Sequence, residues 1–172
     1  PYNDIDAAVT LIREHQEELA AVIVEAFQRL IPPAPGFLEA LREVTEETGV
    51  VLIFDEVVTG FRFAYGGAQE YYGVVPDMCS LGKVVGGGYP LACIAGKDAI
   101  MAHFDASRVA EDEFMQQIGT LSGNPVAAAA GRATLRVLRE PGAYDRLHAT
   151  GRKLKDGIAE LLQKTGTKAQ VV

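Results

Sequence analysis

The chain has 172 residues, 48% of them hydrophobic and 23% charged, which suits one soluble globular unit with a core of its own. Its formal net charge of −7, with no dense run of Lys or Arg, argues against a general nucleic-acid binder. No apolar run reaches the ~18 to 20 residues of a membrane span and no signal peptide is recognisable, so we expect a cytoplasmic protein that does not enter a membrane. Cys79 and Cys93 lack metal-site spacing and should be free thiols.

The first third of the chain predicts a strand–helix–strand unit. Apolar residues at helical spacing, with acidic residues at the start, predict a helix over 4–19. The β-branched run at 20–26 predicts a buried strand. A second helix is expected at 37–49, closed by Gly49, and a second strand at 50–56. This alternation is typical of a βαβ unit and therefore of a parallel sheet.

The rest of the chain predicts shorter strands and then long helices. In order, we expect a strand at 77–83, a turn at 86–90, a strand at 91–96, a helix at 97–104, a surface excursion at 105–118, and helices at 124–140 and 142–166. Gly151 and Gly157 should weaken the last helix. The chain starts without Met and ends on AQVV, which looks like the start of a strand, so we expect a piece of a longer protein.

Two titratable residues close predicted parallel strands. Asp55 ends the second strand and Lys83 the third, and ligands of open parallel sheets bind at this edge. In extended backbone Asp55 and Val57 share one face, and Glu56 lies on the other, where a structural role is expected. A buried carboxylate is costly unless a cation or donor meets it, so Asp55 either caps a loop or faces a ligand. Lys83 is either a solvated surface lysine or a reactive amine.

LIFDE at 52–56 also fits the apolar run with Asp-Glu of a P-loop NTPase. That reading needs an upstream G-x-x-x-x-G-K-[ST]. The Gly-Lys pair with glycines around it, at 82–83, instead lies downstream and is followed by Val84. No G-x-G-x-x-G opens a helix, so a dinucleotide fold is not expected either.

Three segments occur in order: LIFDEVVTGFR (52–62), PDMCSLGKVVGGGYPLA (76–92) and GTLSGNPVAAAAG (119–131). With the 28-residue step from Asp55 to Lys83, they resemble the signatures of the class III aminotransferases, fold-type I enzymes that use pyridoxal 5′-phosphate. The resemblance covers nearly the whole chain. It implies an α/β fold of three αβα layers with a mostly parallel sheet.

The resemblance also divides the chain. Residues 1–140 would belong to the cofactor-binding large domain. Residues 141–172 would form a linking helix and the start of a C-terminal small domain that lies outside this sequence.

The same resemblance assigns roles at the site. It places Asp55 against the pyridine nitrogen, Val57 on the ring face, and Lys83 as the catalytic Schiff-base lysine. The negative charge of Asp55 would keep the ring nitrogen protonated, and the ring would then act as an electron sink. The partners would be a small-molecule amino donor and a keto or aldehyde acceptor.

Three further residues are assigned more loosely. Gly119 and Thr120 match a phosphate contact that the neighbouring subunit donates, which implies a homodimer. Glu25 matches the Glu of a frequent Val-Glu-Pro, although Ala26 stands in place of the Pro, and we expect it to support the site from behind. Arg62 would anchor its own loop or the partner subunit.

Within the family, FRFAYGGAQEYYGVVPDM (61–78) resembles the glutamate-1-semialdehyde aminomutase branch, and Val58 stands where other branches often carry Gln. LACIAG (91–96) and EAFQRLIPP (25–33) depart from the aminomutases. We therefore favour an aminomutase-like aminotransferase, with the aminomutase itself, which forms 5-aminolevulinate, as the alternative. A further alternative is an inactive piece that lacks the rest of the active site.

Overall fold

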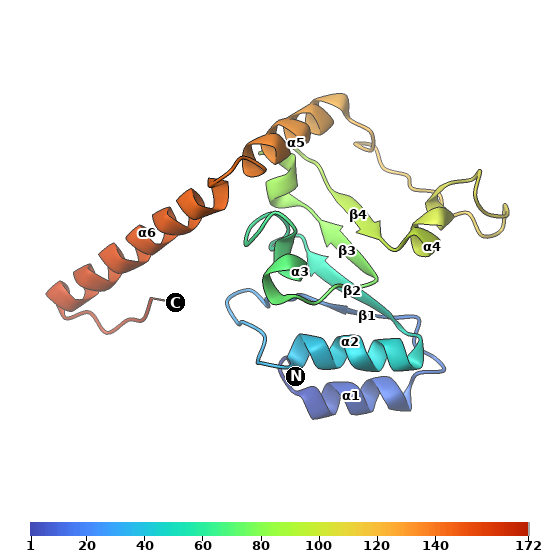
Figure 1. Cartoon of the computed structure of the whole chain (residues 1–172), viewed down its shortest axis with the longest axis horizontal. Helices are drawn as coiled ribbons and strands as arrows, with labels where there is room; N and C mark the ends of the chain where they lie inside the picture. The colour runs from blue at the N-terminus through green and yellow to red at the C-terminus, as the bar shows by residue number, and fades with distance from the viewer. Residues whose placement is uncertain (172) are drawn as a thin grey trace.

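The computed structural model describes residues 1–171, and its centre is a four-stranded sheet in the order β1-β2-β3-β4 (Figure 1). The strands are β1 (Ala21–Val24), β2 (Val51–Glu56), β3 (Met78–Leu81) and β4 (Cys93–Gly96). The first three run parallel, and β4 is antiparallel to β3. The predicted α/β class with a mostly parallel sheet is confirmed.

Helical elements connect and flank the strands. They are α1 (Ile5–Glu14), α2 (Phe37–Thr48), α3 (Gly67–Tyr72), the 3₁₀ turn η1 (Lys83–Gly86), α4 (Asp98–Met101), the 3₁₀ turn η2 (Ala102–Phe104), α5 (Pro125–Leu138) and α6 (Ala143–Thr165). As predicted, Gly49 closes α2 in the left-handed conformation. Asn124 caps α5, its side-chain oxygen accepting from the amides of Val126 and Ala127.

Several boundaries differ from the sequence prediction. α1 ends at Glu14 rather than at residue 19, because residues 15–18 form a turn closed by a hydrogen bond from the Leu19 amide to the His15 carbonyl. The helix expected at 97–104 is split between α4 and η2. α6 runs without interruption through both of its interior glycines. The strand expected at the C-terminal end is absent from residues 169–171, and residue 172 lies outside the described chain.

The core lies on one face of the sheet. In β2 burial alternates strictly, with Leu52, Phe54 and Glu56 fully buried and the residues between them partly exposed. Leu52 and Phe54 form one hydrophobic core with Leu38 and Val44 of α2, which are also buried. Figure 1 shows α1 and α2 side by side below the strands. An amphipathic helix pair over a parallel sheet therefore supplies the core.

The opposite face of the sheet is largely open in the part of the chain that the structure describes. Ile23 of β1 is 65% exposed there, and by strand alternation Ile53, Asp55 and Ser80 share this face. At the C-terminal side, α6 leads away from the sheet and contains no buried residue (Figure 1). The domain division at residue 140 stays a prediction. Among the described helices, none combines the length and apolar character needed to cross a membrane.

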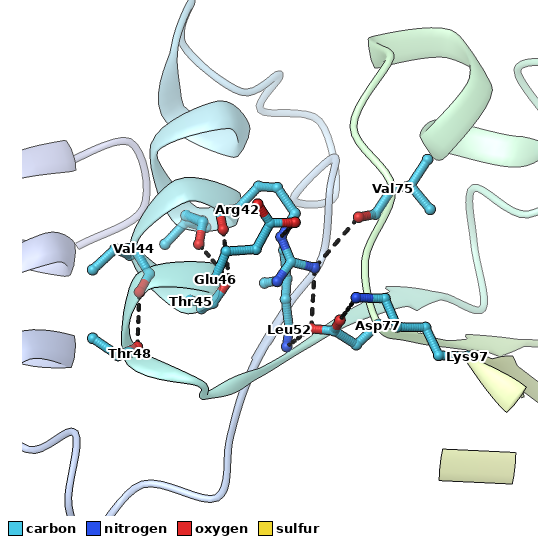
Figure 2. Close-up of polar contacts among 10 residues, drawn as sticks. Arg42, Val44, Thr45, Glu46, Thr48, Leu52, Val75, Asp77 and Lys97 are labelled. Carbon is cyan, nitrogen blue, oxygen red and sulfur yellow. Dashed lines mark hydrogen bonds and ion pairs between the residues drawn. The ribbon is translucent and has the colours of Figure 1, made fainter. Parts of the chain in front are cut away.

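An ion-pair cluster around the buried Asp77 joins α2 to the strands at the amino end of β3 (Figure 2). Asp77, only 6% exposed, precedes β3. Its Oδ2 accepts from the Leu52 amide at 2.7 Å and from Arg42 Nη1 at 3.0 Å, and its Oδ1 lies 2.6 Å from Lys97 Nζ. Burial alone would raise the pKa of Asp77, but the hydrogen bonds from Lys97, the Leu52 amide and Arg42 lower it below its ordinary value.

We predict that Asp77→Asn lowers the free energy of unfolding at neutral pH by about 2–3 kcal/mol, because it removes the buried charge that pairs with Arg42 and Lys97 and leaves Arg42 only the exposed Glu46 as a counter-charge. A lowered folded pKa means that the charged form stabilises the fold above the ordinary value of 3.8, and that this stabilisation is lost as the pH falls through the folded pKa. Urea unfolding at neutral and at acidic pH measures the loss in free energy of unfolding and its dependence on pH. The exposed pair Arg13–Glu47 provides the control, and Glu47→Gln should change much less. Equal effects of the two substitutions would contradict the prediction.

Candidate active site

The carboxyl ends of β2 and β3 bring the predicted site residues to one edge of the sheet. Asp55 pairs with Ser80 in the parallel register, and Glu56 pairs with Leu81. Lys83 follows two residues after β3 ends, at the start of η1. The structure therefore places Asp55 and Lys83 at neighbouring strand ends, as the sequence predicted, at the edge where open parallel sheets bind ligands.

Asp55 is half-buried and uses one carboxylate oxygen for all of its hydrogen bonds. Oδ1 accepts from the Val57 amide at 3.0 Å and from Ser80 Oγ at 3.1 Å. Within residues 1–171, Asp55 forms no ion pair and Oδ2 has no hydrogen-bond donor. The residue thus caps the start of its loop with one oxygen, and its other oxygen is open to a cation.

Gly82, the residue before Lys83, packs closely against Val57. A Cβ built on Gly82 would lie 3.2 Å from Val57 Cγ1, so the backbone before the lysine passes close under that side chain. Lys83 has a φ of 46°, a left-handed conformation that is unfavourable for a residue with a side chain. Its side chain is exposed. Such strain at a strand end is common at functional sites, and here it occurs at the residue predicted to be catalytic.

Glu56 faces away from Asp55, as predicted, and is completely buried. Its carboxylate accepts from Thr59 Oγ1 at 2.9 Å, from the Ala68 amide at 2.5 Å and from Gln69 Nε2 at 2.9 Å. Gly67, at φ 71°, has to lack a side chain, because a Cβ there would overlap Glu56 Oε2. The hydrogen bonds that Glu56 accepts from these three neutral donors therefore hold both ends of the loop 57–66 in place.

The same loop is held from its other side by the C-terminal helices. Tyr144 Oη donates to the Phe61 carbonyl at 2.9 Å, and His148 Nε2 lies 3.0 Å from the Phe63 carbonyl. The guanidinium of Arg139 stacks over the Tyr65 ring at 5.1 Å. Sequence reasoning missed these contacts, because a hydrogen bond across 83 residues leaves no local signal.

The other sequence-predicted residues are not brought into contact with Asp55. Gly119 and Thr120 lie in the exposed turn before α5, where the Ser122 amide donates to the Gly119 carbonyl. Glu25 directly follows β1, at the same edge of the sheet. Burial raises the pKa of nearby Tyr2 to about 12, with smaller contributions that include the charge of Glu25. Their roles stay predictions.

Arg62 binds its own loop, since Nε donates to the Val58 carbonyl at 2.7 Å. An apolar cleft runs between α3 and the strands β3 and β4, lined by Phe61, Met78 and Lys97 among others. Neither Asp55 nor Lys83 lines it. The two candidate residues therefore lie at the strand ends and outside this cleft.

The arrangement fits pyridoxal phosphate. The cofactor has a basic ring nitrogen, a flat ring and a carbonyl carbon. The residues present offer a carboxylate with a free oxygen, an apolar side chain beside it, and an exposed amine on the adjacent strand end. Fold and site together define an α/β protein of the type that holds a cofactor at the carboxyl edge of its sheet.

Comparisons with known proteins agree with this class. The family model for class III aminotransferases matches residues 3–171. A glutamate-1-semialdehyde 2,1-aminomutase of Desulfotalea psychrophila is 48% identical over 99% of this chain. The chain covers 39% of that relative's length. The chain belongs to the class III aminotransferase family, whose members use pyridoxal phosphate.

Solved structures support the fold. An omega-transaminase from Sphaerobacter thermophilus matches 96% of this chain and 38% of its own, with a TM-score of 0.87 and 41% identity. A transaminase with PLP bound matches 98% of this chain and 39% of its own, also with a TM-score of 0.87, at 32% identity. The chain thus has the fold of a corresponding part of these larger enzymes.

We predict that Glu56→Gln loosens the loop 57–66, because an amide cannot accept from all three donors at once. The expected result is a free energy of unfolding lower by about 1–3 kcal/mol and faster tryptic cleavage after Arg62 under native conditions. Glu43→Gln, an exposed acid of α2, is the control and should leave both unchanged. An unchanged cleavage rate at Arg62 would show that Glu56 does not hold the loop.

Proposed function

We propose that this chain is the part of a pyridoxal-phosphate enzyme that holds the cofactor ring, in a protein that moves an amino group between an amino compound and a keto or aldehyde acceptor. The observation that carries the proposal is the pair of strand ends with Asp55 and Lys83 inside the class III motifs. The chain spans about two fifths of the length of its curated relative, so the remainder of the site would come from elsewhere in the protein.

Each residue has a role that its position permits. Asp55 would hold the protonated ring nitrogen through its free oxygen, and Val57 would cover one face of the ring. When bound, the cofactor supplies an electron sink for the charge that develops at the substrate carbon. Lys83 would bind the cofactor's carbonyl carbon covalently and, when free, move the proton at that substrate carbon.

The two assignments are tested in the full-length protein with added pyridoxal phosphate. We expect a visible absorbance band of covalently bound cofactor that disappears in Lys83→Ala, because no amine remains to form the bond. Asp55→Asn should keep the band but weaken cofactor binding at least tenfold, since a neutral amide does not stabilise a protonated ring nitrogen. Lys153→Ala, which removes an exposed lysine of α6 away from the strand ends, is the control. A band that survives Lys83→Ala would overturn the assignment.

A second candidate is the intramolecular reaction of an aminomutase, favoured by the 48% identity to a protein named glutamate-1-semialdehyde 2,1-aminomutase. The two reactions differ in where the nitrogen goes. An aminomutase returns it to the same carbon skeleton, whereas an aminotransferase passes it to a second substrate. Formation of 5-aminolevulinate from glutamate-1-semialdehyde without any second substrate would support the aminomutase, and a strict need for an acceptor would exclude it.

We also propose that the active species is a homodimer in the cytoplasm, in which Thr120 and the Gly119 amide reach the cofactor phosphate of the neighbouring subunit. The exposure of both residues supports this, because they are free to contact another molecule. A hydroxyl and an amide are suitable donors to a phosphate. The 172-residue chain by itself, without the rest of the site, should bind the cofactor poorly.

Subunit mixing tests the contact made by Thr120. Thr120→Ala should weaken cofactor binding by about tenfold through loss of one charge-assisted hydrogen bond. In a hybrid of one Thr120→Ala subunit and one Lys83→Ala subunit, one site has both the lysine and, across the interface, the threonine. That site should bind cofactor with wild-type affinity. If hybrids bind no better than Thr120→Ala homodimers, the contact does not cross the interface.

A further inference from the structure

Ser80 is the side chain that meets Asp55 across the strands. It lies directly opposite Asp55 in the parallel register of β2 and β3, on the open face of the sheet. Its hydroxyl donates to Asp55 Oδ1 at 3.1 Å and has no other partner among residues 1–171. Ser80 also precedes Lys83 by three residues, so one short segment carries both the donor to the acid and the reactive amine.

The contact is selective for one oxygen. Asp55 Oδ1 accepts both the Ser80 hydroxyl and the Val57 amide, and Oδ2 accepts nothing within the described chain. Rotation of the carboxylate would break both bonds at once. The two donors approach from different strands, one from the backbone just beyond β2 and one from β3. The two bonds therefore favour one plane of the carboxylate, in which one of its two equivalent oxygens has no donor from the described residues.

A single donor would not achieve this. The Val57 amide is only two residues from Asp55 in the chain, so the two residues would move together in any movement of the loop. The Ser80 hydroxyl belongs to a neighbouring strand and so ties the carboxylate to the sheet. Without it, Asp55 could swing about its side-chain torsions, because its other oxygen has no partner in the described residues.

Resting on the proposed function, we propose that Ser80 is a positioning residue that orients Asp55, so that Oδ2 faces the ring nitrogen of the cofactor. Ser80 does not contact the reacting atoms and acts only through the acid. Its effect should therefore depend on the presence of a ring nitrogen. A residue that merely supports the fold would affect every ligand of the site alike.

The test compares two ligands on the full-length apoenzyme, pyridoxal phosphate and its analogue with carbon in place of the ring nitrogen. Dissociation constants are measured by titration. Ser80→Ala should weaken pyridoxal phosphate about tenfold and change the affinity for the analogue less than twofold. Ser80→Thr keeps the hydroxyl and suits a strand, so it should bind both ligands within about twofold of wild type.

A matched control exists elsewhere in the chain. The Ser107 hydroxyl donates to Asp105 Oδ1 at 2.7 Å, and the same oxygen also accepts the Ser107 backbone amide. That pair is exposed and outside the site, so Ser107→Ala should leave both affinities unchanged. Equal weakening of both ligands by Ser80→Ala, or none, would overturn the inference.

The inference and the proposed function fail in different ways. In one case, the wild type forms the cofactor band, and Asp55→Asn weakens the affinity for pyridoxal phosphate more than that for the analogue. If Ser80→Ala shows no such difference, Asp55 holds the ring nitrogen without help from Ser80. If the wild-type protein itself forms no band that depends on Lys83, the proposed function is wrong, and the role of Ser80 falls with it.

Discussion

The parallel register between β2 and β3 is the constraint on which the site depends. It places Asp55 opposite Ser80 and Glu56 opposite Leu81, and lets both strands end together. Because side chains alternate across a strand, a slip of one residue would turn Asp55 into the core and Glu56 out to the open face. The hydrophobic pattern of β2, with Leu52 and Phe54 fully buried, excludes that slip.

Two adjacent carboxylates consequently have different environments. Glu56 is buried and satisfied by three neutral donors, so it has a structural function and no capacity for a ligand. Asp55 is half-buried and only half satisfied. An unpaired carboxylate oxygen at a sheet edge is costly unless a cation or water meets it. The contrast explains why we propose the ligand role for the first acid of the pair, while the second holds the loop.

Much of the fold could be predicted from local patterns. The strand–helix–strand unit, the Gly49 cap and the strand-end positions of Asp55 and Lys83 all follow from residue type and spacing. What could not be predicted depends on contacts between distant segments. Ser80 was not singled out because a serine in a strand carries no signal until the register supplies its partner. The contact of Tyr144 with the loop was missed for the same reason. No contact within the described chain tests Thr120.

β3 has only four residues, and both of its ends are fixed by side chains. Before its first residue, Asp77 binds the Leu52 amide through its carboxylate, while the Asp77 amide donates to the Leu52 carbonyl at 2.8 Å. That reciprocal pair sets the register at the amino end. Ser80 then meets Asp55 near the carboxyl end, just before the strained Lys83. A strand this short has few ladder bonds, so the reciprocal Asp77–Leu52 hydrogen bonds add to the hydrophobic pattern of β2 in holding the register that places Asp55 and Lys83 at neighbouring strand ends.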